Sequence, residues 1–310
     1  MHCWCVVLYE IQKKGFEGRL MKNGAEQRDS NVELLKISAI LMIVLSHVIQ
    51  TLSEENTYID FQDYILNLRA ATTNPQILTL SILRYSGALG NSIFFACSAW
   101  FLLDSKKMNE KKWWHMLLEV WFISIVILVM VYVLRIGNID VRLLIQSLFP
   151  TTFSTNWYMT CYLLFYLLHP VLNGIIRRMS QRNLLKSATL LFTLYIGANF
   201  IKRGLFFSSN LALWISIYFG VAYMKLYLKD FMSSTKGNIG IMAVGVIGNI
   251  GLVLITNFLG LKIEFFADKL WYWYTIHNPC LILTAIALLN LAHKISWRNA
   301  FVNHISKLSM

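Results

Sequence analysis

Long apolar runs separated by short polar loops make up most of the chain. Each run is long enough, or nearly so, to cross a bilayer core, which takes about 20 helical residues. The runs lie at approximately 32–52, 80–103, 113–134, 157–176, 185–201, 204–224, 238–258 and 270–292. The segment 141–153 is apolar but shorter, so we expect a re-entrant or interfacial piece there. The pattern predicts an all-α, polytopic transmembrane helix bundle of about eight or nine spans.

Composition and charge support a lipid environment. The chain is 56% apolar and 14% charged, whereas a soluble domain carries about 25% charged residues. The formal net charge is +12, but the basic residues lie in short loops between apolar runs. They are therefore interpreted as topology signals. The expected partner is a lipid bilayer, and nucleic acid is not expected.

The loop charges predict the orientation of the spans. With the N-terminus in the cytoplasm, the inner segments hold most of the Lys and Arg residues, as the positive-inside rule requires. These segments are the tail up to Lys36, 104–112, 177–186, 225–237 and the residues after 292. We predict a multi-pass protein with a cytoplasmic N-terminal tail at 1–28 and one membrane domain at 29–310.

Residues 1–20 make a poor signal peptide, because no basic flank precedes their short apolar run. A misassigned start codon upstream of Met21 and a small cytoplasmic tail are the two explanations. Three of the five cysteines lie in apolar runs, and Cys3 and Cys5 are too close for an ordinary zinc site. We expect inert packing cysteines (Cys3, Cys5, Cys97, Cys161 and Cys280) and no metal.

Ionisable side chains within a span are costly and are therefore functional candidates. His47 follows Lys36 by eleven residues on one apolar helix, which places the two within about 20° on one face and roughly 16 Å apart along the axis. Glu33 precedes Lys36 by three residues and is expected to pair with it. A snorkelling lysine and a histidine satisfied by a neighbouring helix are the structural alternatives.

Other ionisable residues in or near the spans have weaker functional claims. His115 and Glu119 are expected to form a structural pair, and His169 is expected at the interface. His277 precedes Asn278 and Pro279, where polar side chains can satisfy backbone groups that a proline frees. Arg84 is either a snorkelling residue or a substrate ligand.

Four segments resemble the acyltransferase family 3 membrane proteins. The pattern of a basic residue, ten positions and a histidine (Lys36 to His47) resembles the signature of that family's first helix. IFFACSAWFLL (93–103) resembles the second helix, with Ala99 where glycine is usual. KKWWHMLLEVWF (111–122) resembles the basic approach to the third helix, and NWYMTCYLLFYLLHPVLN (156–173) resembles a later helix ending in Pro-x-x-Asn.

The resemblance implies a bacterial inner-membrane enzyme of about ten helices that moves an acyl group, often acetyl, from cytoplasmic acyl-CoA to a hydroxyl of a surface polysaccharide or lipid-linked glycan. Carried over by position, His47 is the catalytic histidine, expected to act as the base, and Lys36 is its basic partner; Glu33 is included among the catalytic residues because it is expected to pair with Lys36. Lys36, Lys111 and Lys112 are the expected donor ligands, and acetyl-CoA or another acyl-CoA is a substrate rather than a bound cofactor. His115 stands where a second arginine is often found.

The resemblance also bears on the C-terminus, because the family continues past a segment like 305–310 into one more helix. We therefore expect a chain that lacks its last helix.

Histidine suits the proposed acyl transfer because a sugar hydroxyl needs a base near neutral pH; a transient acyl-histidine is the alternative. The competing functions are a non-catalytic transporter of glycolipid or small solute and a membrane glycosyltransferase.

Overall fold

The computed structural model describes residues 30–55, 75–135, 140–153, 156–202, 210–260, 262–267, 269–295, 297, 299 and 301–302. These residues form helices joined by short connections, with no strand among them. The all-α prediction is therefore confirmed. The predictions for the tail at 1–28, for Cys3 and Cys5, and for the segment 305–310 lie outside the described residues.

Six helical stretches are long and apolar enough to cross a membrane: Ser30–Ile49, Glu110–Leu134, Trp157–Arg178, Gln181–Ile201, Thr235–Gly260 and Tyr272–Lys294. Two further long helices, α5 (Pro75–Leu102) and α11 (Asn210–Tyr227), pack among them. The chain is thus a multi-pass membrane protein, and the span count of eight or nine stays a prediction.

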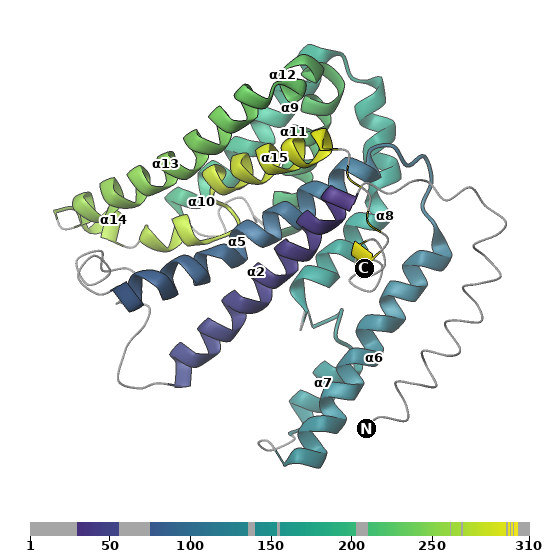
Figure 1. The fold of residues 1–310 in the computed structure, drawn as a ribbon. Helices are drawn as coiled ribbons and strands as arrows, with labels where there is room; N and C mark the ends of the chain where they lie inside the picture. The colour runs from purple at the N-terminus through teal and green to yellow at the C-terminus, as the bar shows by residue number, and fades with distance from the viewer. Residues whose placement is uncertain are drawn as a thin grey trace.

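The helices run alternately up and down (Figure 1). α2 (Ser30–Glu55) lies along α5, and α15 (Pro279–Lys294) packs against both. α13 (Thr235–Gly260) covers α15, while α11 contacts α5, α8 (Trp157–Arg178) and α9 (Gln181–Phe192). The remaining short elements are α12 (Lys229–Ser233), α14 (Glu264–Ala267) and the 3-10 helix η3 (Leu270–Tyr274).

The two least regular predicted segments take distinct forms. The segment 141–153 contains only α7 (Val141–Leu148), a short helix that packs on α6 (Glu110–Leu134) rather than spanning. This agrees with an interfacial piece. The short run at 185–201 is completed by a π-helical turn, η1 (Thr193–Gly197), followed by α10 (Ala198–Ile201). Together with α9, these turns give a stretch long enough to cross a membrane.

Small residues let α2 and α5 approach closely. A Cβ added at Gly90 would lie 2.5 Å from the carbonyl oxygen of Ala39, and one added at Gly87 would lie 2.4 Å from Ser46 Cβ. Because lipid supplies no hydrophobic drive between helices, close packing through small residues is a main source of helix association in membranes. These glycines therefore fix α5 against the helix that carries Lys36 and His47.

Aromatic side chains fill the centre of the bundle between α5, α8 and α11. Phe95 packs against Phe165 and Trp214, with ring centroids 5.2 and 4.2 Å apart. Tyr218 meets Phe165 at 4.9 Å. All four side chains are buried, and such large rings contribute much of the packing contact of a core. They hold the three helices together beneath the ends that carry the candidate site.

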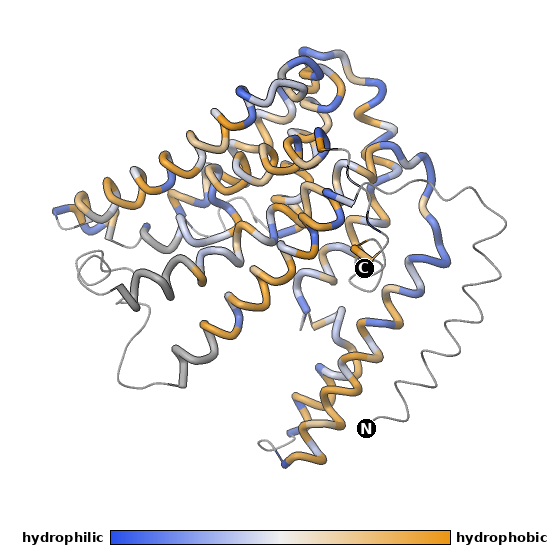
Figure 2. Tube along the Cα trace, viewed as in Figure 1, coloured by the Kyte–Doolittle hydropathy of each residue, from blue (hydrophilic) through white to orange (hydrophobic). Residues whose placement is uncertain are grey.

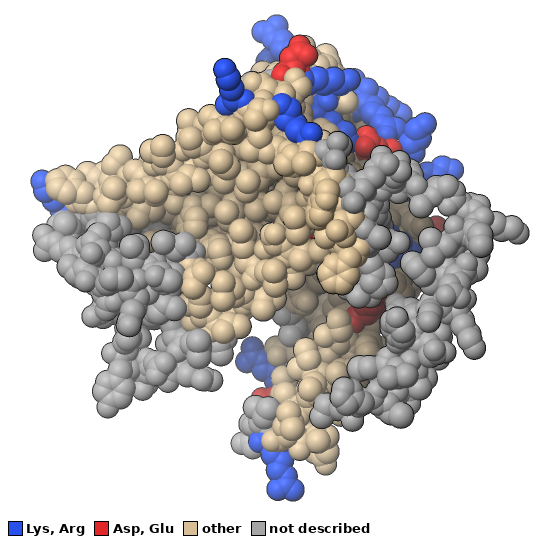
Figure 3. All heavy atoms as spheres, in the orientation of Figure 1, with Lys and Arg blue, Asp and Glu red and all other residues tan. Residues whose placement is uncertain are grey.

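Figure 2 shows that α6 and α13 are apolar along much of their length, and their large side chains such as Trp121, Ile127 and Ile247 are exposed. Lys and Arg instead gather near one end, at the upper right of Figure 3. We call it the basic end: α2, α6, α9 and α13 begin there, and α5, α8, α11 and α15 end there. This asymmetry follows the predicted one; its assignment to the cytoplasm stays a prediction.

Candidate functional site

A buried ion pair lies near the start of α2, at the basic end. Lys36 Nζ is 3.5 Å from Glu33 Oε2, and the residues are 4% and 3% exposed. The ammonium group also lies 4.9 Å from the centre of the Phe101 ring, on the last turn of α5. The predicted Lys36–Glu33 contact is confirmed, and Lys36 does not extend into solvent as a snorkelling anchor would.

The segment after α15 packs over the start of α2. The backbone N–H of Asn299 donates to Ser30 Oγ over 2.7 Å, and the side-chain Nδ2 of Asn31 donates to the carbonyl of Ile295. His293 adds ring contacts to Trp100 and Phe101, with centroids 4.8 and 6.1 Å apart. Lys36 therefore lies beneath a layer of protein, so direct contact between Lys36 and a donor, expected from the sequence, requires that layer to move.

His47 lies on the same helix and differs in its surroundings, because its side chain is exposed. Among the described residues, the neighbouring helices do not enclose this imidazole. The reason is that α5 and α15 cover α2 most completely near Lys36, whereas Val44, Leu45 and Val48 around His47 are also exposed. The predicted shared face of α2 therefore carries a buried lysine, Lys36, and an exposed histidine, His47.

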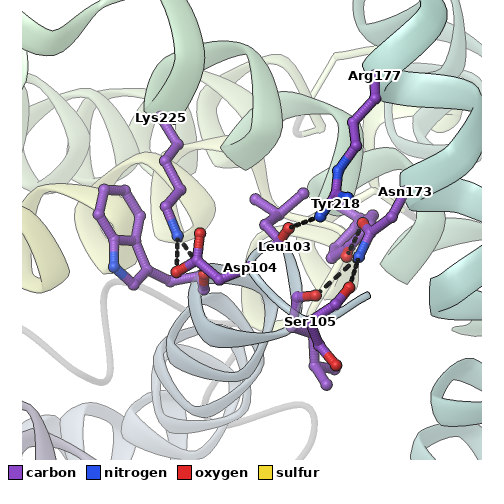
Figure 4. A network of polar contacts seen from close by, with 9 residues as sticks. Leu103, Asp104, Ser105, Asn173, Arg177, Tyr218 and Lys225 are labelled. Carbon is purple, nitrogen blue, oxygen red and sulfur yellow. Dashed lines mark hydrogen bonds and ion pairs between the residues drawn. The ribbon is translucent and has the colours of Figure 1, made fainter. Parts of the chain in front are cut away.

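A second group of polar residues caps the end of α5 (Figure 4). Asn173 Nδ2 donates to the carbonyl oxygens of Leu102 and Ser105, each over 2.8 Å. Tyr218 donates its hydroxyl proton to Asn173 Oδ1 over 2.6 Å. Lys225 Nζ lies 2.7 Å from both the Trp100 carbonyl and Asp104 Oδ2.

The loop that follows α5 and the first turn of α6 together form a basic segment, which we call the basic loop (104–112); it includes Lys111 and Lys112, two of the three predicted donor ligands. Lys106, Lys107, Lys111 and Lys112 are all exposed, the last two in the first turn of α6. Asn109 caps that helix by accepting a hydrogen bond from the Lys112 amide over 3.1 Å. Lys36 and these lysines lie at the same end of the bundle (Figure 1); that Lys36, Lys111 and Lys112 bind a donor stays a prediction. His47 lies farther along α2.

The structure gives the surroundings of most of the other ionisable residues that the sequence analysis considered. His115 Nε2 lies 3.1 Å from Glu119 Oε1, so the expected pair forms, on an exposed face of α6. His169 is fully buried among its neighbouring helices, with Nδ1 2.6 Å from the Tyr166 carbonyl; its depth at the membrane interface stays a prediction. Asn278, next to His277, caps α15. Arg84 lies within α5, but its side chain is outside the described residues.

The capping residues Asn173, Tyr218 and Lys225 were not selected from the sequence as functional residues. Asn173 did stand out in the Pro-x-x-Asn pattern of 156–173, but a pattern does not reveal what an amide binds. Tyr218 and Lys225 gave no signal, because an aromatic residue in a span and a lysine at its end are both common. Cys97, Cys161 and Cys280 are free thiols.

Among the described residues, no group of three or more His, Cys, Asp or Glu side chains could hold a metal ion. The described groups with candidate chemistry are the buried Lys36–Glu33 pair, the exposed His47 and the basic loop. Such a set can bind an anionic group at the basic end and transfer a proton at His47, provided that a substrate reaches both.

An apolar helical bundle with ionisable groups on its first helix defines a polytopic membrane protein with a candidate reaction site. The model of the acyltransferase domain family, acyltransferase family 3, matches residues 29–310, and the chain belongs to this family. It is thus a membrane acyltransferase in the general sense. No curated protein and no solved structure matched it.

Proposed function

We propose that this protein transfers an acyl group, acetyl in the first instance, from cytoplasmic acyl-CoA to a hydroxyl of a cell-surface polysaccharide or lipid-linked glycan. It would thus be an acyltransferase of groups other than aminoacyl groups, in a bacterial inner membrane with its N-terminus in the cytoplasm. Family membership supports the acyl transfer. The observation that carries the proposal is an accessible His47 on the same helix as the buried Lys36–Glu33 pair.

His47 acts as the general base in this mechanism. The acceptor hydroxyl loses its proton to the imidazole while its oxygen attacks the thioester carbonyl, forming the new C–O bond. The tetrahedral intermediate then breaks its C–S bond, and the leaving thiolate takes the proton from His47. The products are an ester and free CoA thiol, and His47 is neutral again.

The basic end supplies the donor side of the proposal. Lys111 and Lys112 are exposed there and would attract the phosphates of acyl-CoA. The rise from Lys36 to His47 is roughly 16 Å, which is comparable with the reach of a pantetheine arm. The thioester would thus meet His47 while the nucleotide stays at the basic end. Lys36 is buried and paired with Glu33, so the exposed lysines supply the charge that attracts the donor.

A matched pair of histidine variants tests the proposal. In liposomes containing the purified protein, we expect release of CoA thiol from acetyl-CoA and ester-linked acetyl on an added glycan acceptor. His47→Ala should abolish both while the protein is still produced and folded. His115→Ala, which removes another exposed histidine, should retain most of the activity.

The outcome also separates acyl transfer from transport. Movement of glycolipid across the liposome membrane without thiol release would support a non-catalytic transporter and contradict our proposal. Full activity of His47→Ala would remove that residue from the mechanism. In cells, the acetyl content of the purified surface glycan should fall when this gene is deleted and should return with the wild-type gene only.

A further inference from the structure

The C-terminus of α5 is held by side chains from two other helices. The last carbonyl groups of any helix lack partners within it and carry partial negative charge. Here Asn173 and Arg177 of α8 and Lys225 of α11 donate to them (Figure 4). The Arg177 contact with the Leu103 carbonyl is the longest, at 3.4 Å.

Tyr218 fixes the orientation of the amide at the centre of this network. Its hydroxyl donates to Asn173 Oδ1, so Nδ2 of the same amide is directed toward the Leu102 and Ser105 carbonyls. Both residues are buried. A hydrogen bond between buried side chains is costly to leave unmade, and this one specifies a single arrangement of α5, α8 and α11.

The far end of the same loop is attached to α8 as well. The backbone N–H of Asn109 donates to the Tyr166 hydroxyl over 3.4 Å, and Trp113 Nε1 donates to the Leu163 carbonyl over 3.2 Å. Much of α6 beyond this point is exposed. The loop is thus attached to α8 at both of its ends, and these attachments mainly set the position of the lysines at 106–112.

We infer that Asn173 and Tyr218 are positioning residues that hold the lysine-bearing loop 104–112 for binding of the donor's phosphate groups. The inference rests on the proposed function. Neither residue touches the reacting atoms. A loop fixed in advance pays less conformational entropy when it closes on an anion, so loosening it weakens donor binding and leaves the chemical step at His47 intact.

Tyr218→Phe tests this role against a matched control. Tyr272→Phe also removes one buried hydroxyl bond, to the Ile196 carbonyl at 2.8 Å, near the opposite end of the bundle. In Tyr218→Phe we expect the KM for acetyl-CoA to rise about two- to tenfold, as loss of one hydrogen bond implies, with kcat nearly unchanged. In Tyr272→Phe, both constants should stay near the wild-type values.

A spin label provides a second measurement that does not depend on turnover. Attached at Lys107→Cys, it should become more mobile when Tyr218→Phe is added and should not respond to Tyr272→Phe. Tyr166→Phe removes one of the two bonds at the other end of the loop, so it should also raise the KM for the donor. This variant preserves the test if Tyr218→Phe does not fold.

The two proposals fail in different ways. An unchanged donor KM in Tyr218→Phe, or an equal rise in Tyr272→Phe, overturns the positioning role while leaving acyl transfer intact. A wild-type protein that transfers no acyl group contradicts the proposed function; the dissociation constant of CoA in wild type and Tyr218→Phe then decides the positioning role. Absence of CoA binding to the wild type overturns that role too.

Discussion

Lys36 and Glu33 form an ion pair 3.5 Å long, and only 5% of each side chain is exposed. Removing two charges from water costs several kcal/mol per ion, which their attraction offsets only in part. A pair of this kind adds little net stability compared with apolar residues of similar size. Its presence on the helix that carries His47 is therefore better explained by function than by stability.

Breaking this pair should destabilise the protein strongly. Glu33→Gln leaves the Lys36 ammonium without its carboxylate, and we expect a loss of about 3–5 kcal/mol in the free energy of unfolding. The double variant Glu33→Gln/Lys36→Met should recover most of that loss. Denaturant unfolding of the detergent-solubilised protein measures both. Glu119→Gln, which breaks the exposed pair with His115, should cost less than about 1 kcal/mol. An equal loss of unfolding free energy in Glu33→Gln and Glu119→Gln would contradict this prediction.

The close approach of α2 and α5 predicts opposite effects for two glycine substitutions. Gly90→Ala places a methyl group against the Ala39 carbonyl oxygen, so we expect a loss of about 1–3 kcal/mol. A Cβ at Gly251 in α13 meets nothing within 4 Å, and Gly251→Ala should stabilise its helix by up to about 1 kcal/mol. Thermal unfolding should rank Gly90→Ala below wild type and Gly251→Ala at or above it.

Asn278 predicts a graded loss of stability where α13 meets α15. It caps α15 through Cys280 N, and its Nδ2 lies 2.6 Å from both Asn249 Oδ1 and the Trp273 carbonyl. Asn249→Ala removes one interhelical bond, costing about 0.6–1.7 kcal/mol. Asn278→Ala also removes the cap, worth about 1 kcal/mol more. Comparison of the two unfolding free energies checks this order, and a larger loss in Asn249→Ala would contradict it.

The basic loop predicts a salt-dependent effect on the donor. If acyl-CoA is the donor, Lys111→Gln/Lys112→Gln should raise its KM, and the difference from wild type should shrink as added salt screens exposed charges. Lys229→Gln/Lys236→Gln removes two other exposed lysines from the basic end and should change the KM less. Steady-state kinetics at two ionic strengths provides the measurement. Equal effects of both double variants would mean that only net charge matters.

The sequence predicted the fold well because apolar runs and loop charges are determined locally. The spans at 113–134 and 157–176 lie within helices of nearly the same extent, and 141–153 proved too short to span. The π-helical turn at Thr193–Gly197 could not be predicted, because its hydrogen-bond register depends on neighbouring helices. The burial of His169 also depends on packing that no local pattern describes.

The candidate site was predictable only in part. Helical spacing placed Lys36 beside Glu33 and on the same face as His47, since both are properties of a single helix. The exposure of each side chain depends on which helices cover α2, and spacing along one helix does not reveal that. The Asn173–Tyr218 bond joins residues 45 positions apart in sequence. A single chain contains no local signal for such a pairing.

The glycine contacts between α2 and α5 limit how this protein can move. Two helices that touch backbone to backbone cannot separate without losing most of their contact, so we expect them to turn and shift as one rigid body. Substrate exchange at His47 must then take place from the uncovered sides of α2. Any rearrangement that makes room for a large acceptor then involves helices outside this pair, such as the hairpin of α6 and α7.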